Sequence, residues 1–415
     1  MKQILWFRRD LRLDDNAILA HAKGEVLPIF IFDTDILSSL SKDDKRVTFI
    51  YQSVLKLKNS LRSIGLDLAI FYGKPKDIFQ KLKNIGFKNA LCSVDNDSYA
   101  IQRDKEIEEI LKIERFSDSF LIRPEDHLKK DGSPYRVFTP FYKSLSPIWE
   151  SARIGEYIPS KSIKLFDFDY SNIPSLEDMG FRKQNLPIFL NQDPRVVLKE
   201  FLPKLKNYKK NRDFWSIDAT SKMSIFLRFG LISPRQIFNL LKGSDGSDDY
   251  IRELFWREFY NYILYHFPKS EFENFLDINP KWQNDEKVFE KWKTGQTGVP
   301  IIDAAMRYLN QTGLMHNRLR MITASFLTKN LLIDWKWGEK YFAQKLLDYE
   351  ASSNIGSWQW AASTGADAAP YFRIFNPYIQ SAKFDPDAIF IKQIIPELKN
   401  LSAKDIHKEN FSQNL

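Results

Sequence analysis

The stretch SNIGSWQWAASTGADAAPYFRIFNP, residues 353–377, carries two tryptophans one residue apart, Trp358 and Trp360, among small side chains. An amphipathic helix places its bulky apolar residues three or four positions apart, where they share a face. At a spacing of two, the indoles leave the backbone in different directions, and the small neighbours allow close approach. The stretch therefore predicts a segment that presents one indole to each of two different surroundings.

The sequence on both sides of this stretch is helical in pattern. From residue 192 nearly to the end, apolar residues recur at helical spacing, as in VLKEFLPKL, YIRELFWREFYNYILYHF and NRLRMITASFLTKNLLIDW. Residues 151–190 lack a clear period and are rich in Pro, Ser, Asp and Lys. We predict an all-helical C-terminal domain over residues 192–415, joined through a long interdomain connection over residues 131–191.

The N-terminal part alternates short apolar runs with longer amphipathic stretches. The runs at 3–7, 26–32, 66–72 and 89–94 are typical of buried strands, and residues 46–64, 75–84 and 99–113 have helical periodicity. Strand–helix alternation predicts an α/β domain over residues 1–130, with a doubly wound parallel sheet. The sequence contains neither a G-x-G-x-x-G after a strand nor a GK[ST] loop, which argues against a dinucleotide fingerprint or a P-loop.

Composition leaves the partner open. Lys and Arg number 61 against 53 Asp and Glu, a formal charge of +8, which suits a polyanion partner and equally an ordinary charged surface. The one cysteine is Cys92, and the five histidines lack a metal-binding spacing, so we expect no disulfide within the chain and no metal site. The N-terminus lacks a signal-peptide core, and no uncharged apolar run reaches about 18 residues. We expect a cytoplasmic protein with no membrane segment.

Several polar and aromatic residues of the helical region stand at spacings that place them on one helix face. Glu253 and Trp256 are three residues apart, and Asn317 and Met321 are four apart. Each alone has an ordinary explanation as a packing residue or a partly exposed acid. Together, a carboxylate, an amide, a thioether and indoles suit a pocket for a planar, base-like ligand. The residues by themselves leave both interpretations open.

A hydroxyl-rich stretch raises a similar choice. TSKMS, residues 220–224, follows Tyr208 and Arg212 and could hold a diphosphate through hydroxyl and backbone N–H groups. A Thr-Ser helix cap is the commoner meaning of such a stretch.

Three long segments carry a resemblance to a known family: WFRRDLRLDDN (6–16), WKTGQTGVPIIDAAMRYLNQTGLMHNRLRMITASFLTKNLLIDW (292–335) and GSWQWAASTGADAAPYFRIFNP (356–377). The sequence resembles the DNA photolyase/cryptochrome flavoproteins over almost its whole length, and within them it is most similar to class I photolyases. The resemblance implies FAD in the helical domain and light-dependent repair of cyclobutane pyrimidine dimers by electron transfer from photoexcited FADH⁻. The implied enzyme is a deoxyribodipyrimidine photo-lyase.

The resemblance also assigns cofactor-binding residues. Arg320 and Asp348 would form an ion pair beside the isoalloxazine, Asn354 would face flavin N5, and Glu350 stands where the family often has Asp. The remaining predicted FAD contacts are Tyr208, Thr220, Ser221, Lys222, Met223 and Ser224.

The flipped lesion would occupy a pocket on the same domain. Damaged DNA is the implied partner, bound by a monomer, with Glu253 stabilising the dimer's radical anion and Arg318 directed toward the DNA backbone. The implied pocket residues are Glu253, Trp256, Asn317, Met321 and Trp360. Trp358, Trp335 and Trp282 resemble an electron-transfer chain that runs from the flavin toward solvent.

Three matters stay open from the sequence. The Asn-Glu pair of folate-binding relatives is missing near Tyr99 and Ala100, so a deazaflavin, a flavin or no antenna chromophore all remain possible. The chain ends at KENFSQNL, short of the family's usual C-terminal segment. The alternatives to dimer repair are a cryptochrome-type blue-light photoreceptor, repair of (6-4) photoproducts, or a non-enzymatic nucleic-acid-binding protein.

Overall fold

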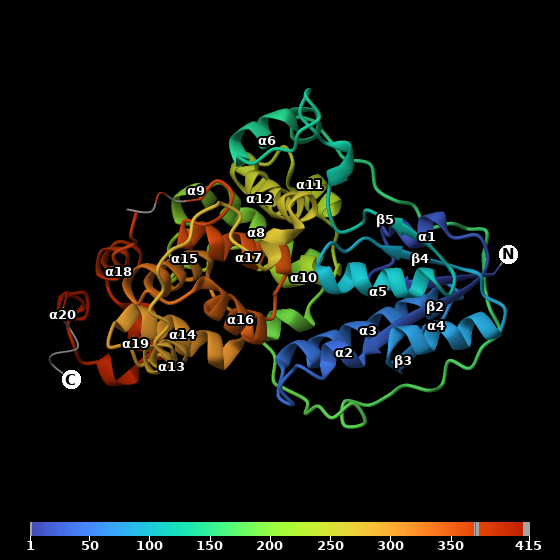
Figure 1. Ribbon diagram of the computed structural model, residues 1–415, viewed down its shortest axis with the longest axis horizontal. Coiled ribbons are helices and arrows are strands. Elements are labelled where there is room, and N and C mark those ends of the chain that lie inside the picture. Colours follow the sequence, from blue (N-terminus) through green and yellow to red (C-terminus); the bar gives the residue numbers. More distant parts are fainter. Residues whose placement is uncertain (1, 369, 371–372, 410–415) are drawn as a thin grey trace. The chain divides into compact units, whose positions relative to one another are not determined.

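The computed structural model describes residues 2–368, 370 and 373–409 and divides into two compact units. The first unit comprises Met1–Ser133, Leu145–Lys199 and Lys222–Gly243, and the second comprises Pro134–Ser144, Glu200–Ser221 and Ser244–Leu415. Figure 1 labels the elements of both. These units cut across the boundaries predicted at residues 130 and 191, which stay a prediction about functional domains.

The first unit is built on a parallel sheet. Its described strands are β1 (Lys2–Phe7), β2 (Gly24–Asp33), β3 (Ala69–Gly73), β4 (Asn89–Ser93), β5 (Lys112–Phe116) and β6 (Ile163–Leu165). They are ordered β3-β2-β1-β4-β5, and β6 pairs with the start of β2. All pairs are parallel, as expected of apolar runs buried on both faces.

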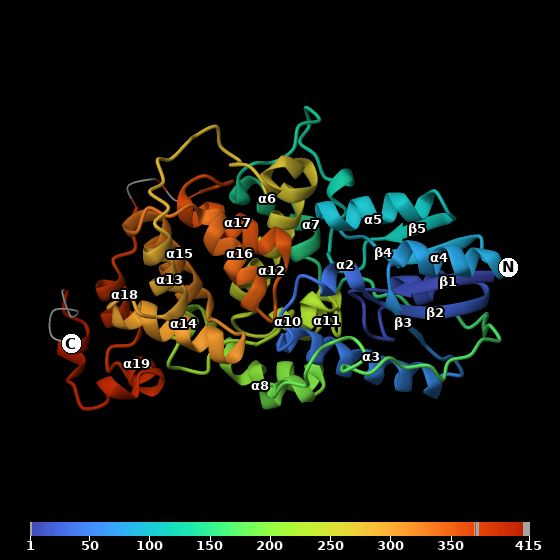
Figure 2. The same cartoon turned by 60° about the horizontal axis from the view of Figure 1, so that its bottom comes forward.

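Helices cover both faces of this sheet. They are α1 (Ala17–His21), α3 (Lys45–Ser63), α4 (Pro75–Asn84) and α5 (Ser98–Glu108). Figure 2 shows α4 and α5 on one side of the strands and α3 on the other. The predicted doubly wound α/β fold is confirmed. One boundary was wrong and one strand was missed: the helix predicted over 99–113 ends at Glu108, and the alternating sequence KIERF then forms β5.

A segment distant in sequence completes the first unit. It contains α10 (Ser224–Arg228) and α11 (Pro234–Leu241). Arg235 bonds the buried Asp15 at 2.8 and 2.9 Å, and Leu11 N donates to Phe229 O at 3.1 Å. Gly230 has φ +65°, and a Cβ there would meet Arg9 O at 2.0 Å. The loop after β1 therefore holds this segment through close backbone contact and buried charge.

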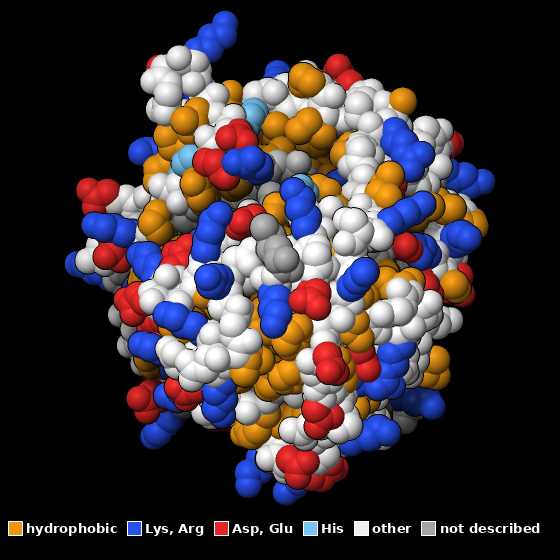
Figure 3. Space-filling model, turned by 90° about the vertical axis from the view of Figure 1, so that its right-hand side faces the viewer, with side chains coloured by type: hydrophobic (Ala, Val, Ile, Leu, Met, Phe, Trp, Pro, Cys, Tyr) orange, Lys and Arg blue, Asp and Glu red, His pale blue; other side chains and the backbone are white. Residues whose placement is uncertain are grey.

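The other elements of the first unit lie in its connections. They are α2 (Thr34–Leu37), η1 (Pro124–Asp126), α7 (Ser146–Trp149) and η2 (Ile188–Asn191), with α8 (Pro194–Leu205) beginning in this unit and ending in the second. The stretch predicted as an irregular connection, 131–191, thus also contains regular structure. On the face shown in Figure 3, basic and acidic side chains are interspersed, so that face gives the +8 charge no concentrated binding surface.

The second unit is helical, as predicted. Its principal helices are α12 (Ser247–His266), α13 (Glu286–Thr294), α14 (Pro300–Thr312), α15 (Asn317–Ser325), α16 (Trp335–Lys345) and α17 (Ala351–Ala362). The shorter elements are α6 (Phe138–Ser144), α9 (Tyr208–Asn211), η3 (Pro268–Glu271), the π-helical η4 (Phe326–Asn330), α18 (Pro377–Phe384), α19 (Ile389–Ile394), η5 (Pro396–Leu398) and α20 (Ala403–Ile406). Its core gathers apolar side chains of α13 to α17 and of α19. Throughout the described part of the chain, no helix has the length and apolarity needed to cross a membrane.

Candidate functional site

Helix α17 carries the two tryptophans with which the sequence is most distinctive. Trp358 is 2% exposed and packs in the core, its ring centroid 5.0 Å from that of Phe342 and 6.0 Å from that of Trp292. Trp360 is only half-buried and lies 6.1 Å from Phe375. The spacing of two thus places the indoles in different surroundings, one dry and one partly open.

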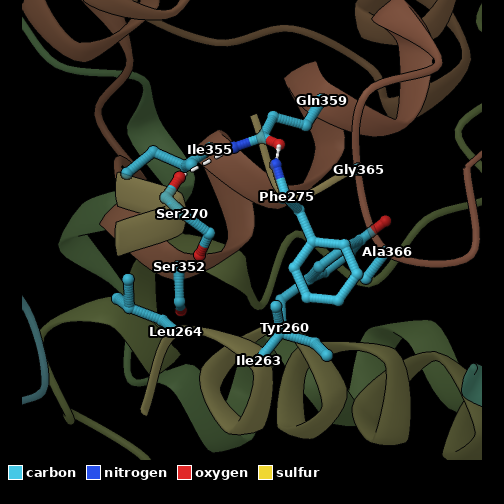
Figure 4. A pocket seen from close by; sticks show the side chains of 11 residues that line it. Tyr260, Ile263, Leu264, Ser270, Phe275, Ser352, Ile355, Gln359, Gly365 and Ala366 are labelled. Atoms are coloured by element: carbon cyan, nitrogen blue, oxygen red, sulfur yellow. Dashed lines mark hydrogen bonds between the residues drawn. The ribbon is translucent and has the colours of Figure 1, made fainter. Parts of the chain in front are cut away.

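The residue between them fixes this orientation. Figure 4 shows Gln359 directed toward Ser270 and Phe275. Its amide donates to Ser270 O at 2.7 Å and Glu273 O at 3.1 Å, and its carbonyl accepts from Phe275 N at 2.8 Å. The cavity drawn there measures about 10 Å³, the space of about one water-sized probe, so the region is packing and not a ligand site.

Trp335 and Trp282 lie against the same apolar core as Trp358. Trp335 begins α16, is 1% exposed, and donates its indole N–H to Asn274 Oδ1 at 2.9 Å. One turn further along α16, Gly338 leaves room for Trp358: a Cβ at this glycine would lie 2.2 Å from Trp358 Cη2.

The third tryptophan is the most open of the three. Trp282 is half-buried and packs on the core, and the next residue, Gln283, bonds Leu332 O at 2.7 Å, three residues before Trp335. Trp358 and Trp335 are thus both buried, and Trp282, at the end of the predicted order, is the partly open one.

Arg320 and Asp348 form the ion pair that the resemblance implies. Arg320 Nη2 contacts the two carboxylate oxygens at 2.9 and 2.7 Å, and its Nε donates to Met315 O at 2.9 Å. The Asp348 side chain is 3% exposed and that of Arg320 is 29% exposed. Among the described residues Nη1 of Arg320 has no partner, so the guanidinium can still donate to a ligand.

Asn354 on α17 has a similar spare group. Its amide N–H₂ donates to Glu339 Oε1 at 3.0 Å, and Asn354 is buried. Within the described part of the chain its Oδ1 accepts no hydrogen bond. Burial raises the pKa of the Glu339 carboxyl, although the hydrogen bonds from Asn354 and Tyr349 lower it. Glu339 therefore orients the amide so that its oxygen is left as an acceptor.

Glu350 is likewise paired. It receives Arg257 Nη2 at 3.0 Å on Oε1 and the Ser353 hydroxyl at 3.3 Å on Oε2. The longer side chain at this position is thus held by its own arginine beside the start of α17.

Glu253 on α12 forms an ion pair with Arg212, which directly follows α9. Both side chains are about one-third exposed, at 32% and 34%. Although burial lowers it, the pKa of Arg212 is raised overall by Glu253, and the guanidinium carbon lies 5.6 Å from the ring centroid of the buried Tyr208. Arg212 therefore holds the Glu253 side chain at an accessible position.

Trp256, one turn along α12, has one face covered. Phe138 of α6 stacks on it with centroids 3.7 Å apart and planes 8° apart, and Trp256 is half-buried. On α15, the predicted contact at i and i+4 is present, with Asn317 Nδ2 3.7 Å from Met321 Sδ. Asn317 is exposed and Met321 half-buried.

Arg318, predicted to face DNA, is engaged within the protein. Its Nη2 lies 2.8 Å from Asp213 Oδ2, and its guanidinium lies 4.9 Å from the ring centroid of Phe384. The side chain is 18% exposed. Beside it, His316 caps α15 by accepting from Arg318 N at 3.1 Å, and burial lowers the pKa of the imidazole to about 4.

The TSKMS stretch lies where the second unit gives way to the first. Ser221 is buried in the second unit, with its hydroxyl 2.8 Å from that of Tyr250, and Thr220 is half-buried. Lys222, Met223 and Ser224 belong to the first unit, where Lys222 has φ +59° and Met223 is buried. Ser224 is exposed at the start of α10.

Sequence reasoning missed the partners that orient these side chains. Arg212, Asp213, Arg257 and Glu339 join predicted residues 41, 105, 93 and 15 positions away, and no local motif signals such pairs. Among the described residues no cluster of His, Cys, Asp and Glu suits a metal ion.

Comparisons with known proteins show which family the chain belongs to. Residues 3–168 match the family described as DNA photolyase, and residues 250–414 match the FAD binding domain of DNA photolyase. A deoxyribodipyrimidine photo-lyase of Alkalihalophilus pseudofirmus is 37% identical, and the match covers 97% of this chain and 89% of that protein. The chain belongs to the DNA photolyase family.

Two solved structures are also similar over nearly the whole chain. An archaeal photolyase from Sulfolobus tokodaii, described with two FAD molecules that imply a novel light-harvesting cofactor, has a TM-score of 0.85 at 34% identity, covering 98% of this chain and 93% of that one. A cryptochrome from Synechocystis sp. PCC6803 has a TM-score of 0.89 at 29% identity, covering 100% and 93%.

These matches confirm the predicted family, the two-part fold, the FAD cofactor and the enzyme class of a deoxyribodipyrimidine photo-lyase. The residues present fit the cofactor. Considering the described residues alone, Arg320 Nη1 is an unused donor and Asn354 Oδ1 an unused acceptor in a largely apolar helical unit. The polar edge of an isoalloxazine offers both an acceptor and a donor, so the donor set is complementary to a flavin.

Proposed function

We propose that this protein repairs cyclobutane pyrimidine dimers in DNA, driven by light absorbed by reduced FAD. The observation that carries the proposal is the division of α17 into a buried side with Trp358 and a half-open side with Trp360, with Asn354 one turn before Trp358. A dry tryptophan suits electron supply, and an accessible one suits a stacked base.

When bound, FAD supplies the light absorption and the electron. Asn354 Oδ1 and Arg320 would hold it, with Asp348 neutralising Arg320. Tyr208, Glu350 and the stretch Thr220, Ser221, Lys222, Met223 and Ser224 complete the proposed cofactor contacts. The protein contributes orientation and electrostatics, and the cofactor contributes the redox chemistry.

Side chains of α12, α15 and α17 would contact the lesion. Trp256 has Phe138 on one face and offers the other to a base, and Trp360 offers a second ring. Stacking on an aromatic ring is worth about 1–3 kcal/mol per base, comparable with the cost of extruding a damaged pair. Glu253 would accept a hydrogen bond from an N–H group of the dimer's pyrimidine edge, with Asn317 and Met321 lining the wall.

Two arginines near the proposed lesion pocket, Arg212 and Arg318, are already paired within the protein. Each is paired with a carboxylate, Glu253 and Asp213 respectively. We propose that Arg318 contacts the DNA backbone by exchanging Asp213 for phosphate, which makes its contribution to affinity smaller than that of an unpaired arginine. The partner is damaged DNA, bound by a monomer inside the cell.

The three tryptophans would replenish the electron. Trp358 and Trp335 are buried and lie along one side of α16, and Trp282 is partly open, so an electron can pass inward from the solvent side. Each step moves one electron from one indole to the oxidised indole before it.

The test is photoreactivation. A duplex with one cyclobutane dimer, bound by chemically reduced protein, should return to intact pyrimidines under blue or near-ultraviolet light and stay unchanged in the dark. A (6-4) duplex is the control. We expect no repair of the (6-4) duplex, because the neutral His316 imidazole already accepts a hydrogen bond from Arg318 N as the cap of α15. Flavin photoreduction without repair of either lesion would favour the photoreceptor alternative that the Synechocystis cryptochrome represents.

A second chromophore is proposed for the first unit. Its support lies where β1 and β4 end side by side, the switch point at which parallel sheets bind ligands. Among the described residues, Arg8 Nε, Asp10 Oδ2 and Ser93 Oγ are buried there without a hydrogen-bond partner. Burial, with Asp118 nearby, raises the pKa of Asp10 to about 7. Pigment extraction should yield a compound besides FAD, and FAD alone would refute this.

A further inference from the structure

Asn274 is joined to the middle tryptophan of the proposed electron path. Trp335 donates its indole N–H to Asn274 Oδ1 at 2.9 Å. An indole has one polar atom and it is a donor, so this bond uses the whole hydrogen-bonding capacity of Trp335. With Trp335 1% exposed, water cannot readily replace the amide.

The acceptor is held in a fixed orientation. Asn274 Nδ2 donates to Ile278 O at 2.8 Å, which assigns the amide nitrogen away from Trp335 and the oxygen toward it. The flanking backbone is anchored to α17, because Gln359 bonds Glu273 O and Phe275 N on either side of Asn274. The tryptophan pair of α17 and the acceptor of Trp335 are therefore part of one rigid arrangement.

This bond changes strength when Trp335 is oxidised. In the proposed path, Trp335 gives one electron to oxidised Trp358, which restores Trp358, and then takes one electron from Trp282. While Trp335 carries the positive charge, its N–H is a charged donor, and such hydrogen bonds are roughly twice as strong as neutral ones. Asn274 therefore stabilises oxidised Trp335 more than neutral Trp335.

The chemical nature of the acceptor decides where the proton stays. A carboxamide oxygen is not a base at neutral pH, so the N–H proton remains on the indole and Trp335 can be reduced again by electron transfer alone. A carboxylate at this place could remove the proton and leave a neutral radical. Lys336, with its ammonium 6.0 Å from the ring centroid, is exposed, so solvent screens its charge.

We propose that Asn274 is a positioning residue for the photoreduction path, which stabilises the radical cation of Trp335 while leaving its proton in place. The inference rests on the proposed function, because it assumes that Trp335 carries an electron between Trp358 and Trp282.

The test uses Asn274→Leu, which removes the acceptor, and Asn274→Asp, which replaces it by a base of the same size. Trp335→Phe is the control for the path itself. The first measurement, in the dark protein, is the ¹⁵N–¹H resonance of the Trp335 indole, assigned by its loss in Trp335→Phe. In Asn274→Leu this resonance should shift and exchange faster with solvent. An unchanged resonance would overturn the proposal.

The second measurement is flash spectroscopy on FAD-loaded protein, which distinguishes tryptophan cations from neutral tryptophan radicals. Asn274→Leu should lower the yield of oxidised Trp282 about five- to tenfold, the difference between a charged and a neutral hydrogen bond. Asn274→Asp should form a neutral radical at Trp335. Wild-type yields in Asn274→Leu, despite an altered resonance, would leave Asn274 a purely structural role and refute the inference. Normal photoreduction in Trp335→Phe would instead refute the electron path itself.

Discussion

Trp358 and Trp360 lie on one helix turn, yet their surroundings differ in almost every respect. Trp358 is 2% exposed, fits over Gly338 and packs against the rings of Phe342 and Trp292. Trp360 packs against the same apolar core but is only half-buried, so part of its ring is open. The difference teaches that one short motif can serve two tasks, because a dry fixed ring suits electron transfer and an accessible ring suits stacking.

The same contrast separates the ion pairs of the two sides. Asp348, which faces Arg320, is 3% exposed, whereas Glu253, which faces Arg212, is 32% exposed. A buried charge deprived of its partner is costly, while an exposed one is solvated by water. Four predictions test or sharpen this comparison.

The largest effect is expected at the buried pair. Arg320→Ala should lower the free energy of unfolding by about 3–5 kcal/mol and abolish FAD retention, because Asp348, 3% exposed, is left without its counter-ion. Arg212→Ala, the matched variant, leaves Glu253 at 32% exposure and should cost within about 1 kcal/mol and keep FAD. Urea unfolding and flavin content measure both. Equal costs would remove the distinction between the two sides.

Trp256→Ala should weaken dark binding of dimer-containing DNA by about 1–3 kcal/mol, since one stacking face is lost. Trp335→Phe, on the dry side, should bind the lesion as wild type does. Fluorescence anisotropy on FAD-loaded variants makes the comparison. Wild-type affinity in Trp256→Ala would place the lesion elsewhere than on α12.

Gly338→Ala probes how closely Trp358 is packed. The added Cβ would lie 2.2 Å from Cη2, so the ring or α16 must move, at about 1–3 kcal/mol. Lys340→Ala, at an exposed position of the same helix, is the control and should be nearly neutral. The midpoint temperature of thermal unfolding and the rate of flavin photoreduction should both fall in Gly338→Ala and stay unchanged in Lys340→Ala. An unaffected Gly338→Ala variant would mean that Trp358 is not fixed by this contact.

The smallest effect is expected from acid. The pKa of His316 is lowered to about 4, so between this value and its ordinary value near 6.5 the unfolded chain binds the proton and the folded protein does not. Stability should therefore fall as the pH drops, by about 1 kcal/mol between pH 7.5 and 5.5.

His316→Asn keeps a side-chain acceptor for the cap and removes the titration. Its free energy of unfolding should fall less than that of the wild type over the same range of pH, as measured by urea titration at each pH. An identical fall in the variant would assign the acid sensitivity to other groups.

How far the sequence sufficed differs between fold and site. Continuous apolar runs such as 3–7 and 26–32 predicted the parallel sheet, because burial on both faces leaves a local signature. β5 was missed because its alternation over 112–116 follows a helix directly. The site residues came from motifs, but their partners came from tertiary contacts: nothing in WGEKYF signals that Glu339 meets Asn354, or in HNRLRM that Asp213 holds Arg318.

The division of labour within α17 is tested most directly by dark binding of a dimer-containing duplex to two FAD-loaded variants, Trp358→Phe and Trp360→Ala. We predict that Trp360→Ala loses about fivefold or more in affinity, the lower limit for one stacked base, and that Trp358→Phe binds as wild type does. Equal losses in the two variants, or a loss in Trp358→Phe alone, would contradict the assignment of one indole to the lesion and the other to electron supply.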